Sequence, residues 1–384
     1  MGSLRVAVDA RPLAHPYTGI GQYLRRLMNE LLEISAHRYF LYGNGADIAP
    51  PARWADVVWR TTRHSAPLLN HAHARFTFPR WARADEADVY FAPRHFLPPL
   101  PVGMAGVLTI HDLVWRTHPD TMRMGGRALE RRTTPASIAR ADQLLTTTES
   151  VRQDVVALTP DADERLRVAP LAPTIEPEQP NAATADPHDA PRSAVARPFA
   201  EPYFVFCGTM EPRKNLGRLL AAYASLVDDD NPPRQRMLII SSGGWHNDTV
   251  KAAAERLGER VAVVADADDA DKTALIAAAD FLVQPSLHEG FGLPVADALA
   301  LGTPVLAANT GALPEVAADA ALYVDPASTS DIQDKLNRMC ADANLRADLA
   351  AAARRRAAEF SWRRTAEITL AAIEDAAAGR GRRV

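Results

Sequence analysis

Residues 281–300 read FLVQPSLHEGFGLPVADALA, and this stretch contains the unit that decides the fold. The apolar run Phe281–Gln284 is short enough for a β-strand, and a loop with two glycines follows it. Pro294 then suits the first turn of a helix, where its missing N–H group costs nothing. Strand, loop and helix in this order are the repeating element of α/β folds, so the stretch predicts a parallel strand covered by a helix.

Two carboxylates in the same stretch are candidate ligand-binding groups. The glycines on either side of Phe291 leave the backbone free to wrap around a ligand. Glu289 lies on this loop, and we expect Asp297 early in the following helix. Carboxylates placed in this way can bind two different hydroxyl-bearing parts of one ligand. A capped loop followed by a helix with an acid near its start would account for Asp297, but not for the whole constellation.

The same rhythm extends outward in both directions along the chain. Short apolar runs alternate with Ala- and Leu-rich amphipathic stretches, which predicts parallel sheets with helices on both faces. The expected strands are Leu4–Val8, Tyr39–Tyr42, Val89–Phe91, Val107–Ile110, Gln143–Thr146, Tyr203–Cys207, Met237–Ile240, Val261–Val264, Phe281–Gln284, Pro304–Ala307 and Ala321–Val324.

The rhythm breaks once, between about Pro170 and Pro202, in a segment rich in Pro, Ala, Asp and Glu. Such a segment is typical of a linker or a long exposed loop. We therefore expect an N-terminal domain over 1–173, a linker over 174–201 and a C-terminal domain over 202–360. The remaining residues, 361–384, are expected to form a helix that packs back on the first domain, followed by a basic tail.

A glycine-containing segment, TGIGQY, follows the first expected strand and precedes the helical run Leu24–Leu32. Gly19 and Gly21 would let the backbone turn tightly and approach a ligand closely. The start of the helix would offer N–H groups and a positive dipole end to a phosphate. A plain turn is the alternative for so short a motif.

Polar residues also end the run that closes with TIHD. Open α/β sheets bind ligands in the crevice outside the carboxyl ends of their strands, so His111 and Asp112 are candidate site residues. The alternative is an Asp that caps the next turn and a His packed beside it. Arg94 and His95, which follow another expected strand, are either residues that face the ligand or parts of a surface loop.

Two adjacent cations, Arg213 and Lys214, stand in the segment GTMEPRKN, just before a helical run that starts near Leu216. Arginine can fork onto phosphate oxygens and lysine acts as a point charge, so the pair suits a diphosphate. A solvated basic pair is the alternative. Cations at the start of a helix oppose its dipole, which favours a bound anion.

Length and composition limit the function classes. A chain of 384 residues with 47% hydrophobic residues has the size of two domains with a sizeable core. The net charge of −4 argues against a dedicated nucleic-acid binder. Cys207 and Cys340 have no metal-ligand spacing and suit reduced cysteines of a cytosolic protein. We expect neither a signal peptide nor a transmembrane helix, because no apolar run approaches ~18 residues.

Taken together, the motifs resemble the retaining glycosyltransferases of family 4, which have the GT-B fold. The resemblance covers nearly the whole chain and rests on blocks in the family's order. These blocks are VDARPL, TGIGQY, VLTIHDLVW, GTMEPRKN, ADFLVQPSLHEGFGLPVADALALGTPV and GALPEVAADAALYVDP. It implies two Rossmann-like, doubly wound parallel-sheet domains that face each other across a cleft.

The resemblance also implies roles for single residues. Gly19 and Gly21 would lie beneath the donor diphosphate, and His111 would face the donor sugar near the reaction centre. Arg213 and Lys214 would bind the diphosphate and stabilise the leaving group. The remaining expected contacts are Glu289 with hydroxyls of the transferred sugar, the backbone of Gly290, Phe291 and Gly292 with sugar and phosphate, and Asp297 with the nucleotide ribose.

Two positions depart from the family pattern. Asp297 stands where the family has Glu, which gives Glu–x7–Asp, and its side chain is one methylene shorter. It can still reach a ribose directly or through a water. Thr209 stands where some relatives have another phosphate-binding Arg, so Arg213 and Lys214 would carry more of that task.

The mechanism that the resemblance implies is a front-face displacement with retention of anomeric configuration. The leaving phosphate oxygen takes the proton of the acceptor, and the protein stabilises the departing diphosphate, positions the acceptor and excludes water. We expect no cofactor and no metal, since the chain has no DxD-type cluster at a strand end. The triplet Asp228–Asp230 precedes Asn231-Pro232-Pro233 and is interpreted as a solvated loop.

The best match among donors is GDP-mannose, on subfamily resemblance alone, with dTDP-rhamnose and UDP-sugars as alternatives. The acceptor would be a saccharide or a lipid-linked saccharide of a surface polysaccharide. The expected location is cytoplasmic, with contact to the inner face of the membrane and the oligomeric state left open. A 2-epimerase has the same architecture but is disfavoured by EGFGLP, and a non-catalytic nucleotide-sugar-binding protein is the third class. The base would lie against Ser241–Gly244 and Ala265–Asp266.

Overall fold

The computed structural model describes residues 2–15, 18–44, 54–62, 67–175, 199–241, 248–265 and 267–380. Its contacts divide the chain into two compact units. Unit 1 comprises Met1–Thr117, Arg123–Leu171 and Ser361–Val384, and unit 2 comprises His118–Met122 and Ala172–Phe360. Most of the expected linker, and the expected base-contacting residues Ser242–Gly244 and Asp266, lie outside the described residues.

Unit 1 is built on a parallel sheet of seven strands in the order β3-β2-β1-β4-β5-β6-β7. The strands are β1 Arg5–Asp9, β2 Arg38–Asn44, β3 Val58–Thr62, β4 Val89–Ala92, β5 Ala105–Ile110, β6 Gln143–Thr146 and β7 Leu166–Val168. The helices are η1 Arg11–Ala14, α1 Gly19–Ile34, α2 Pro67–Ala72, the π-helix η3 His73–Thr77, α3 Phe78–Ala84, α4 Val114–Thr117, α5 Met124–Arg140, α6 Glu149–Leu158, η5 Pro160–Arg165 and α14 Trp362–Arg380.

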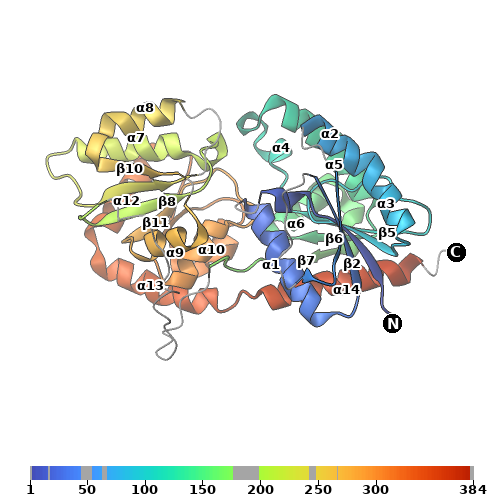
Figure 1. Cartoon of the computed structure of the whole chain (residues 1–384). Helices are drawn as coiled ribbons and strands as arrows, with labels where there is room; N and C mark the ends of the chain where they lie inside the picture. Colours follow the sequence, from blue (N-terminus) through green and yellow to red (C-terminus); the bar gives the residue numbers. More distant parts are fainter. Residues whose placement is uncertain are drawn as a thin grey trace. The chain divides into compact units, whose positions relative to one another are not determined.

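The last helix of the chain, α14, packs within unit 1, where it lies against α1 and strands β4 to β7 (Figure 1). Its buried side chains include Ala366, Ile373 and Ala376. The buried strands β4 and β5 have apolar residues on both faces, as parallel strands between two helical layers require.

Unit 2 repeats the architecture with a parallel sheet of six strands in the order β10-β9-β8-β11-β12-β13. Its strands are β8 Tyr203–Cys207, β9 Arg236–Ile240, β10 Val261–Val264, β11 Phe281–Gln284, β12 Val305–Ala308 and β13 Ala321–Val324. Its helices are η4 Pro119–Thr121, η6 Pro212–Lys214, α7 Leu216–Val227, α8 Asp248–Leu257, η7 Gly258–Arg260, α9 Asp269–Ala277, α10 Leu293–Leu301, α11 Leu313–Ala317, η8 Ala318–Ala320, α12 Thr329–Ala341 and α13 Ala343–Ala357.

The core of unit 2 lies between its sheet and the helices α7 and α12 (Figure 1). Phe204 of β8 stacks on Phe281 of β11 with ring centroids 5.2 Å apart, and Tyr223 of α7 meets Phe204 edge-on at 5.1 Å. Aromatic pairs in these geometries add to the gain from burying their area. They fix β8 beside β11, the two strands that carry the candidate site.

Each sheet has a point where the strand order reverses. In unit 1 the chain leaves β1 toward β2 and β3 and returns to its other side at β4; in unit 2 the same reversal separates β8 from β11. In open α/β sheets the connections diverge at such a point, and ligands bind in the crevice outside the carboxyl ends of the two strands. The loops after β1, β4, β8 and β11 are therefore the candidate ligand-binding loops.

Eleven expected strands are found, and they confirm the α/β class with two doubly wound parallel sheets. Two strands, β3 and β7, were not predicted. The prediction that Gly19 and Gly21 precede the helix is wrong, because α1 begins at Gly19 and not near Leu24. Asp297 is the fifth residue of α10, which begins at Leu293.

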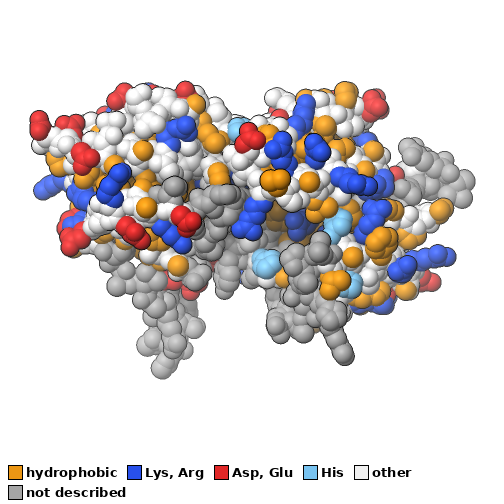
Figure 2. Space-filling view, turned by 90° about the horizontal axis from the view of Figure 1, so that it is seen from above, with side chains coloured by type: hydrophobic (Ala, Val, Ile, Leu, Met, Phe, Trp, Pro, Cys, Tyr) orange, Lys and Arg blue, Asp and Glu red, His pale blue; other side chains and the backbone are white. Residues whose placement is uncertain are grey.

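The surface of unit 1 has a distinctive mixture of side chains. On the face seen from above in Figure 2, Lys and Arg side chains lie among hydrophobic ones. Met124 of α5 is 87% exposed and Leu129 is 43% exposed, with Arg131 and Arg132 exposed next to them. Phe76 of η3 is a further exposed aromatic side chain. The first half of α5 is thus a basic helix surface with uncovered apolar residues.

Candidate active site

The carboxyl ends of β8 and β11 bring together three charged residues of unit 2. Arg213 and Lys214 lie in η6, in the turn that follows β8, and Glu289 lies on the loop that follows β11. Lys214 is 8% exposed and Glu289 is 5% exposed. The sequence predicted each as a site residue, and the reversal of strand order makes them neighbours across 75 positions of sequence.

Glu289 is the centre of this cluster. Its Oε1 accepts hydrogen bonds from Lys214 Nζ at 2.6 Å, Ser286 Oγ at 2.7 Å and Gln284 Nε2 at 3.1 Å. Its Oε2 accepts one from Arg213 Nη1 at 2.8 Å. Short, charge-assisted bonds to both oxygens hold the carboxylate in one orientation.

The charges decide the protonation state of Glu289. Burial alone would raise its pKa, but the positive charges of Lys214 and Arg213 and the hydrogen bonds from Lys214 and Ser286 outweigh burial. The pKa of Glu289 therefore lies well below its usual range, and the residue is an anion at neutral pH. The carboxylate is thus the counter-ion of two cations that suit a diphosphate.

Backbone contacts fix the two loops against each other. Asn215 adopts a left-handed conformation, with φ of 62°, which ends η6 and starts α7. Its Nδ2 donates to the carbonyls of Pro285 at 3.0 Å and Pro326 at 2.8 Å. The N–H of Leu287 donates to the carbonyl of Arg213 at 2.8 Å. Asn215 was quoted in the sequence motif, but its positioning role was not predicted.

The glycine-containing loop is shaped by contacts inside unit 2. Gly292 has φ of 94°, and a Cβ there would lie 2.6 Å from Leu313 Cδ2. Phe291 is buried and meets Phe360 edge-on with centroids 5.6 Å apart. Gly290, between Glu289 and Phe291, shares this anchored backbone. The loop is held from one side by aromatic packing.

Gly311 supports the same loop from the other side, and sequence reasoning missed it. A Cβ on Gly311 would lie 2.8 Å from the carbonyl oxygen and 2.9 Å from the nitrogen of Glu289, and its φ is 58°. The N–H of Ala312 donates to the same carbonyl at 3.0 Å. Only glycine combines this conformation with this close approach. The glycine after a strand was a visible signal, but its partner in space was not.

Asp297 does not project into open space. Its Oδ1 accepts from the backbone N–H of Thr174 at 2.6 Å, and its Oδ2 accepts from the Thr174 hydroxyl at 2.9 Å. Burial raises the pKa of Asp297 to about 6, although the hydrogen bonds from Thr174 and Ile175 and the charge of Lys272 oppose this. Asp297 thus anchors Thr174, which lies near the start of the unit 2 segment that begins at Ala172.

The remaining predicted residues lie in unit 1. The ring of His111 packs edge-on against Tyr23 at 4.8 Å, and its Nε2 lies 2.8 Å from the carbonyl oxygen of Pro93. A carbonyl can only accept, so Nε2 carries the proton and Nδ1 is left as an acceptor. Burial, with a smaller contribution from His95, lowers the pKa of His111 to about 4, so the ring is neutral at pH 7.

His95 and Asp112 build the loop that carries His111. The backbone N–H groups of His111 and Asp112 point to His95 Nε2, at 3.1 and 3.4 Å. The Asp112 carboxylate accepts from the N–H of Val114 at 3.2 Å and so caps α4. This geometry favours the capping alternative for Asp112 and gives His95 the task of positioning His111.

Gly21 serves packing inside unit 1. Thr18 is the N-cap of α1 and accepts from the N–H of Gly21 at 3.2 Å. A Cβ on Gly21 would lie 2.2 Å from the carbonyl oxygen of His15, so a larger residue would push the preceding loop away from the helix. Gly19 is the first residue of α1. The close approach to His15 shows why position 21, in the first turn of α1, holds a glycine.

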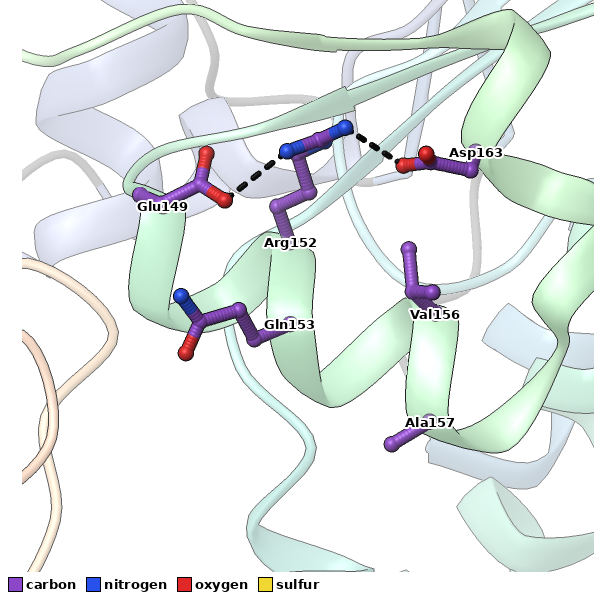
Figure 3. A pocket seen from close by; sticks show the side chains of 6 residues that line it. All are labelled: Glu149, Arg152, Gln153, Val156, Ala157 and Asp163. Atoms are coloured by element: carbon purple, nitrogen blue, oxygen red, sulfur yellow. Dashed lines mark hydrogen bonds and ion pairs between the residues drawn. The ribbon is translucent and has the colours of Figure 1, made fainter.

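A pocket of about 300 Å³ lies elsewhere on unit 1, between α6 and η5. Figure 3 shows the Arg152 guanidinium between the carboxylates of Glu149 and Asp163, at 2.8 and 2.7 Å. None of the predicted site residues lines it. Over the described ranges, no cluster of three or more His, Cys, Asp or Glu side chains could hold a metal ion. Within the same ranges, no helix has the length and apolarity needed to cross a membrane.

Solved structures have the same fold as this chain. Sucrose-phosphate synthase from Thermosynechococcus elongatus superposes with a TM-score of 0.70 at 18% identity, over 95% of this chain and 97% of that one. WaaG, a glycosyltransferase involved in lipopolysaccharide biosynthesis, does so with a TM-score of 0.70 at 19% identity, over 96% and 99%. The chain has the GT-B fold.

Sequence comparisons add to this GT-B assignment. Residues 190–356 match the family model described as glycosyl transferases group 1. O-antigen chain mannosyltransferase B of Escherichia coli is 29% identical over 394 residues, covering 97% of this chain and all of that protein. D-inositol 3-phosphate glycosyltransferase of Saccharomonospora viridis is 32% identical over 253 residues, covering 63% of this chain and 57% of that protein. These matches support a glycosyltransferase with the GT-B fold.

Proposed function

We propose that this GT-B protein is a retaining, metal-independent hexosyltransferase of family 4. It would transfer mannose from GDP-mannose to a saccharide or lipid-linked saccharide in surface polysaccharide synthesis. The observation that carries the proposal is the buried cluster of Arg213, Lys214 and Glu289 at the reversal point of the unit 2 sheet. Two cations and one carboxylate there suit the two chemically different parts of a nucleotide-sugar, the diphosphate and the sugar hydroxyls.

Lys214 is suited to the diphosphate because of its few commitments. Its ammonium group has three N–H bonds, and Glu289 accepts the hydrogen bond that it makes within the described part of the chain. An incoming phosphate oxygen can take another N–H without breaking that bond. Negative charge develops on the diphosphate as the glycosidic bond breaks, and a preorganised cation in a dry site stabilises such charge strongly.

Glu289 is suited to the sugar for the complementary reason. It is ionised and lies beside the cations; its Oε1 already accepts three hydrogen bonds, whereas Oε2 accepts one from Arg213 and can accept another from a sugar hydroxyl. We further propose that His111, a neutral ring with an acceptor at Nδ1, takes a hydrogen bond from a hydroxyl group of the donor sugar. Retention then follows from attack on the face that the phosphate leaves, with the phosphate oxygen as the base.

Mannose and the polysaccharide acceptor are supported by relatives. The protein that matches over its whole length is named an O-antigen chain mannosyltransferase, and another match is named an MMP alpha-(1->4)-mannosyltransferase. The donors dTDP-rhamnose and UDP-sugars remain the alternatives. We also propose a peripheral contact with the membrane, which the basic, partly apolar surface of α5 supports.

The test is calorimetric binding of GDP, UDP and dTDP to the whole chain with EDTA present. We expect tight binding of GDP, weakened at least tenfold in Lys214→Ala. We also expect Glu289→Gln to bind GDP as well as the wild type or better, because it removes a negative charge from beside the phosphate, yet to lose transfer by at least about 100-fold. Lys251→Ala, an exposed lysine on α8, is the matched control and should bind normally.

The outcomes separate the hypotheses. Tight binding of UDP or dTDP instead of GDP would replace the donor and keep the reaction class. Binding of a nucleotide without turnover of any nucleotide-sugar would favour the non-catalytic binding protein. Absence of binding to all three, in a protein that melts cooperatively, would overturn the proposal.

A further inference from the structure

The reversal point of the unit 1 sheet carries a second group of charges, which the reaction outlined above does not use. Asp9 ends β1 and is fully buried, and Arg11 follows it in η1. Arg11 Nε and Nη2 donate to the Asp9 carboxylate at 2.8 and 2.6 Å. This bidentate pair saturates the acid and holds the guanidinium at the carboxyl end of β1.

Helix α2 and the loop after β4 meet at the same place. Arg11 Nη1 lies 3.3 Å from the carbonyl oxygen of Asn70 in α2. The next residue, His71, packs its ring on Phe96 with centroids 4.5 Å apart. Phe96 stands two residues after Arg94 in the loop that follows β4, the strand paired with β1. The side chains of η1, α2 and the β4 loop are therefore neighbours.

The charges that gather here are mostly positive. Arg94 and Arg75 are exposed, and neither makes an ion pair within the described residues. The acids nearby are committed elsewhere: Asp9 to Arg11, and Glu130 to the ring of His95 at 3.8 Å.

The pKa of His71 is lowered by burial and by the positive charges around it. These are the charges of Arg11, Arg75 and Arg94. Three guanidinium groups thus act on one imidazole, which stays neutral at pH 7. An anion between them would remove this repulsion and allow His71 to take up a proton.

We propose that Arg94, Arg75 and His71 form a binding site for a phosphoryl group of the acceptor. Two guanidinium groups match the charge of a phosphate dianion and can fork onto its oxygens. The imidazole adds one donor when it is protonated. Arg11 is held in place by its ion pair with Asp9, and its charge also lowers the pKa of His71. As a site for the acceptor this rests on the proposed function, whereas the anion site itself does not.

Inorganic phosphate is the first probe, because it has the phosphoryl group of the proposed ligand and no other part of an acceptor. The whole chain, labelled at histidine, is titrated with phosphate by NMR in saturating GDP, and the His71 signal is assigned from its loss in His71→Gln. We expect saturable binding, with the His71 pKa raised by at least one unit. Arg75→Gln with Arg94→Gln should weaken phosphate binding at least tenfold; Arg83→Gln, an exposed arginine on α3, should leave it unchanged.

Two further arms identify the source of the phosphoryl group. A saccharide carried on a lipid phosphate and the same saccharide without phosphate are compared as acceptors. The double variant should raise the KM of the first at least tenfold and leave that of the second unchanged. Unaltered phosphate affinity in the double variant, or a His71 pKa that phosphate does not move, would overturn the site. A chain that binds phosphate at His71 but no nucleotide would sink the donor assignment and leave the anion site standing.

Discussion

Asp297 and Thr174 form a buried pair whose energy depends on pH. The folded pKa of Asp297 is about 6, raised by burial from its usual value near 3.8. The folded protein therefore favours the protonated acid, and this group contributes most stability below about pH 4 and loses it as the pH rises through 6. From pH 5 to 7 the loss is on the order of 1 kcal/mol, since one pKa unit corresponds to about 1.4 kcal/mol.

We expect Asp297→Asn to remove this pH dependence. Its amide oxygen can still accept from the Thr174 N–H, so the segment stays attached while the titration disappears. Urea denaturation at pH 5 and pH 7 would show a smaller difference in unfolding free energy for the variant than for the wild type. Asp230→Asn, which changes an exposed acid, should retain the wild-type difference. An unchanged pH dependence in Asp297→Asn would show that the acid titrates normally.

At this scale the sequence predicted the chemistry of residues but not their pairing. Arg213, Lys214 and Glu289 were identified from residue type and motif. Their mutual ion pairs depend on β8 lying beside β11, and no local pattern encodes that neighbourhood. The sequence showed that Asp297 is one methylene shorter than the Glu of the family pattern. It did not show that Thr174 is its hydrogen-bond partner, because the two residues are 123 positions apart. Gln284 and Ser286, which donate to Glu289, were overlooked as ordinary polar residues.

The loop after β11 and the loop after β12 are held together at Gly311. We expect Gly311→Ala to lower stability by about 1–3 kcal/mol, because a left-handed conformation and a backbone clash are combined. The clash falls on the backbone of Glu289, so turnover should drop more than donor binding. Chemical denaturation and steady-state kinetics of the same preparation would measure both effects.

The control for this substitution lies in α7. Gly217 has open space around its Cβ position, and no positive φ is found there. Gly217→Ala should therefore leave activity unchanged and raise stability by up to about 1 kcal/mol through helix propensity. Equal effects of the two substitutions would refute the close approach of Gly311 to Glu289.

Element boundaries show why local patterns are reliable for some segments only. Strands such as β6, β8 and β11 were predicted at their exact bounds, because they are short runs rich in apolar residues, each bounded by a polar residue, Pro or Gly. β3 and β7 carry Arg60 and Arg167 and are less apolar, so they gave no such signal. α1 begins at Gly19 because Thr18 caps it, a contact that outweighs the poor helix propensity of the glycines.

The two units of the molecule share one architecture. Both sheets reverse their strand order once, and in both the charged side chains stand after the two strands at the reversal. The alternation of strands and helices in the sequence predicted the parallel sheets, but strand order is a long-range property that alternation does not fix. It is strand order that brings Arg213 to Glu289 and Arg11 to the β4 loop. The chemistry of this chain is therefore a consequence of topology as much as of motifs.

The distribution of charge over the molecule leads to the last prediction. The chain as a whole has a net charge of −4, which opposes adsorption to anionic lipids. Any binding must then come from a local surface, and α5 offers Arg131 and Arg132 with the exposed apolar side chains of Met124 and Leu129. Basic groups near an anionic bilayer contribute about 1 kcal/mol each, and this contribution falls with salt.

We therefore expect the protein to sediment with phosphatidylglycerol vesicles at low salt, and not with phosphatidylcholine vesicles. Arg131→Glu with Arg132→Glu should weaken this binding at least tenfold. The matched control reverses two exposed arginines of unit 2, Arg234→Glu with Arg256→Glu, and so changes the net charge by the same amount. If both double variants lose binding equally, net charge governs adsorption; if only the α5 variant loses it, that helix surface is the membrane contact. If the wild-type protein does not sediment with anionic vesicles at low salt, the membrane contact is refuted.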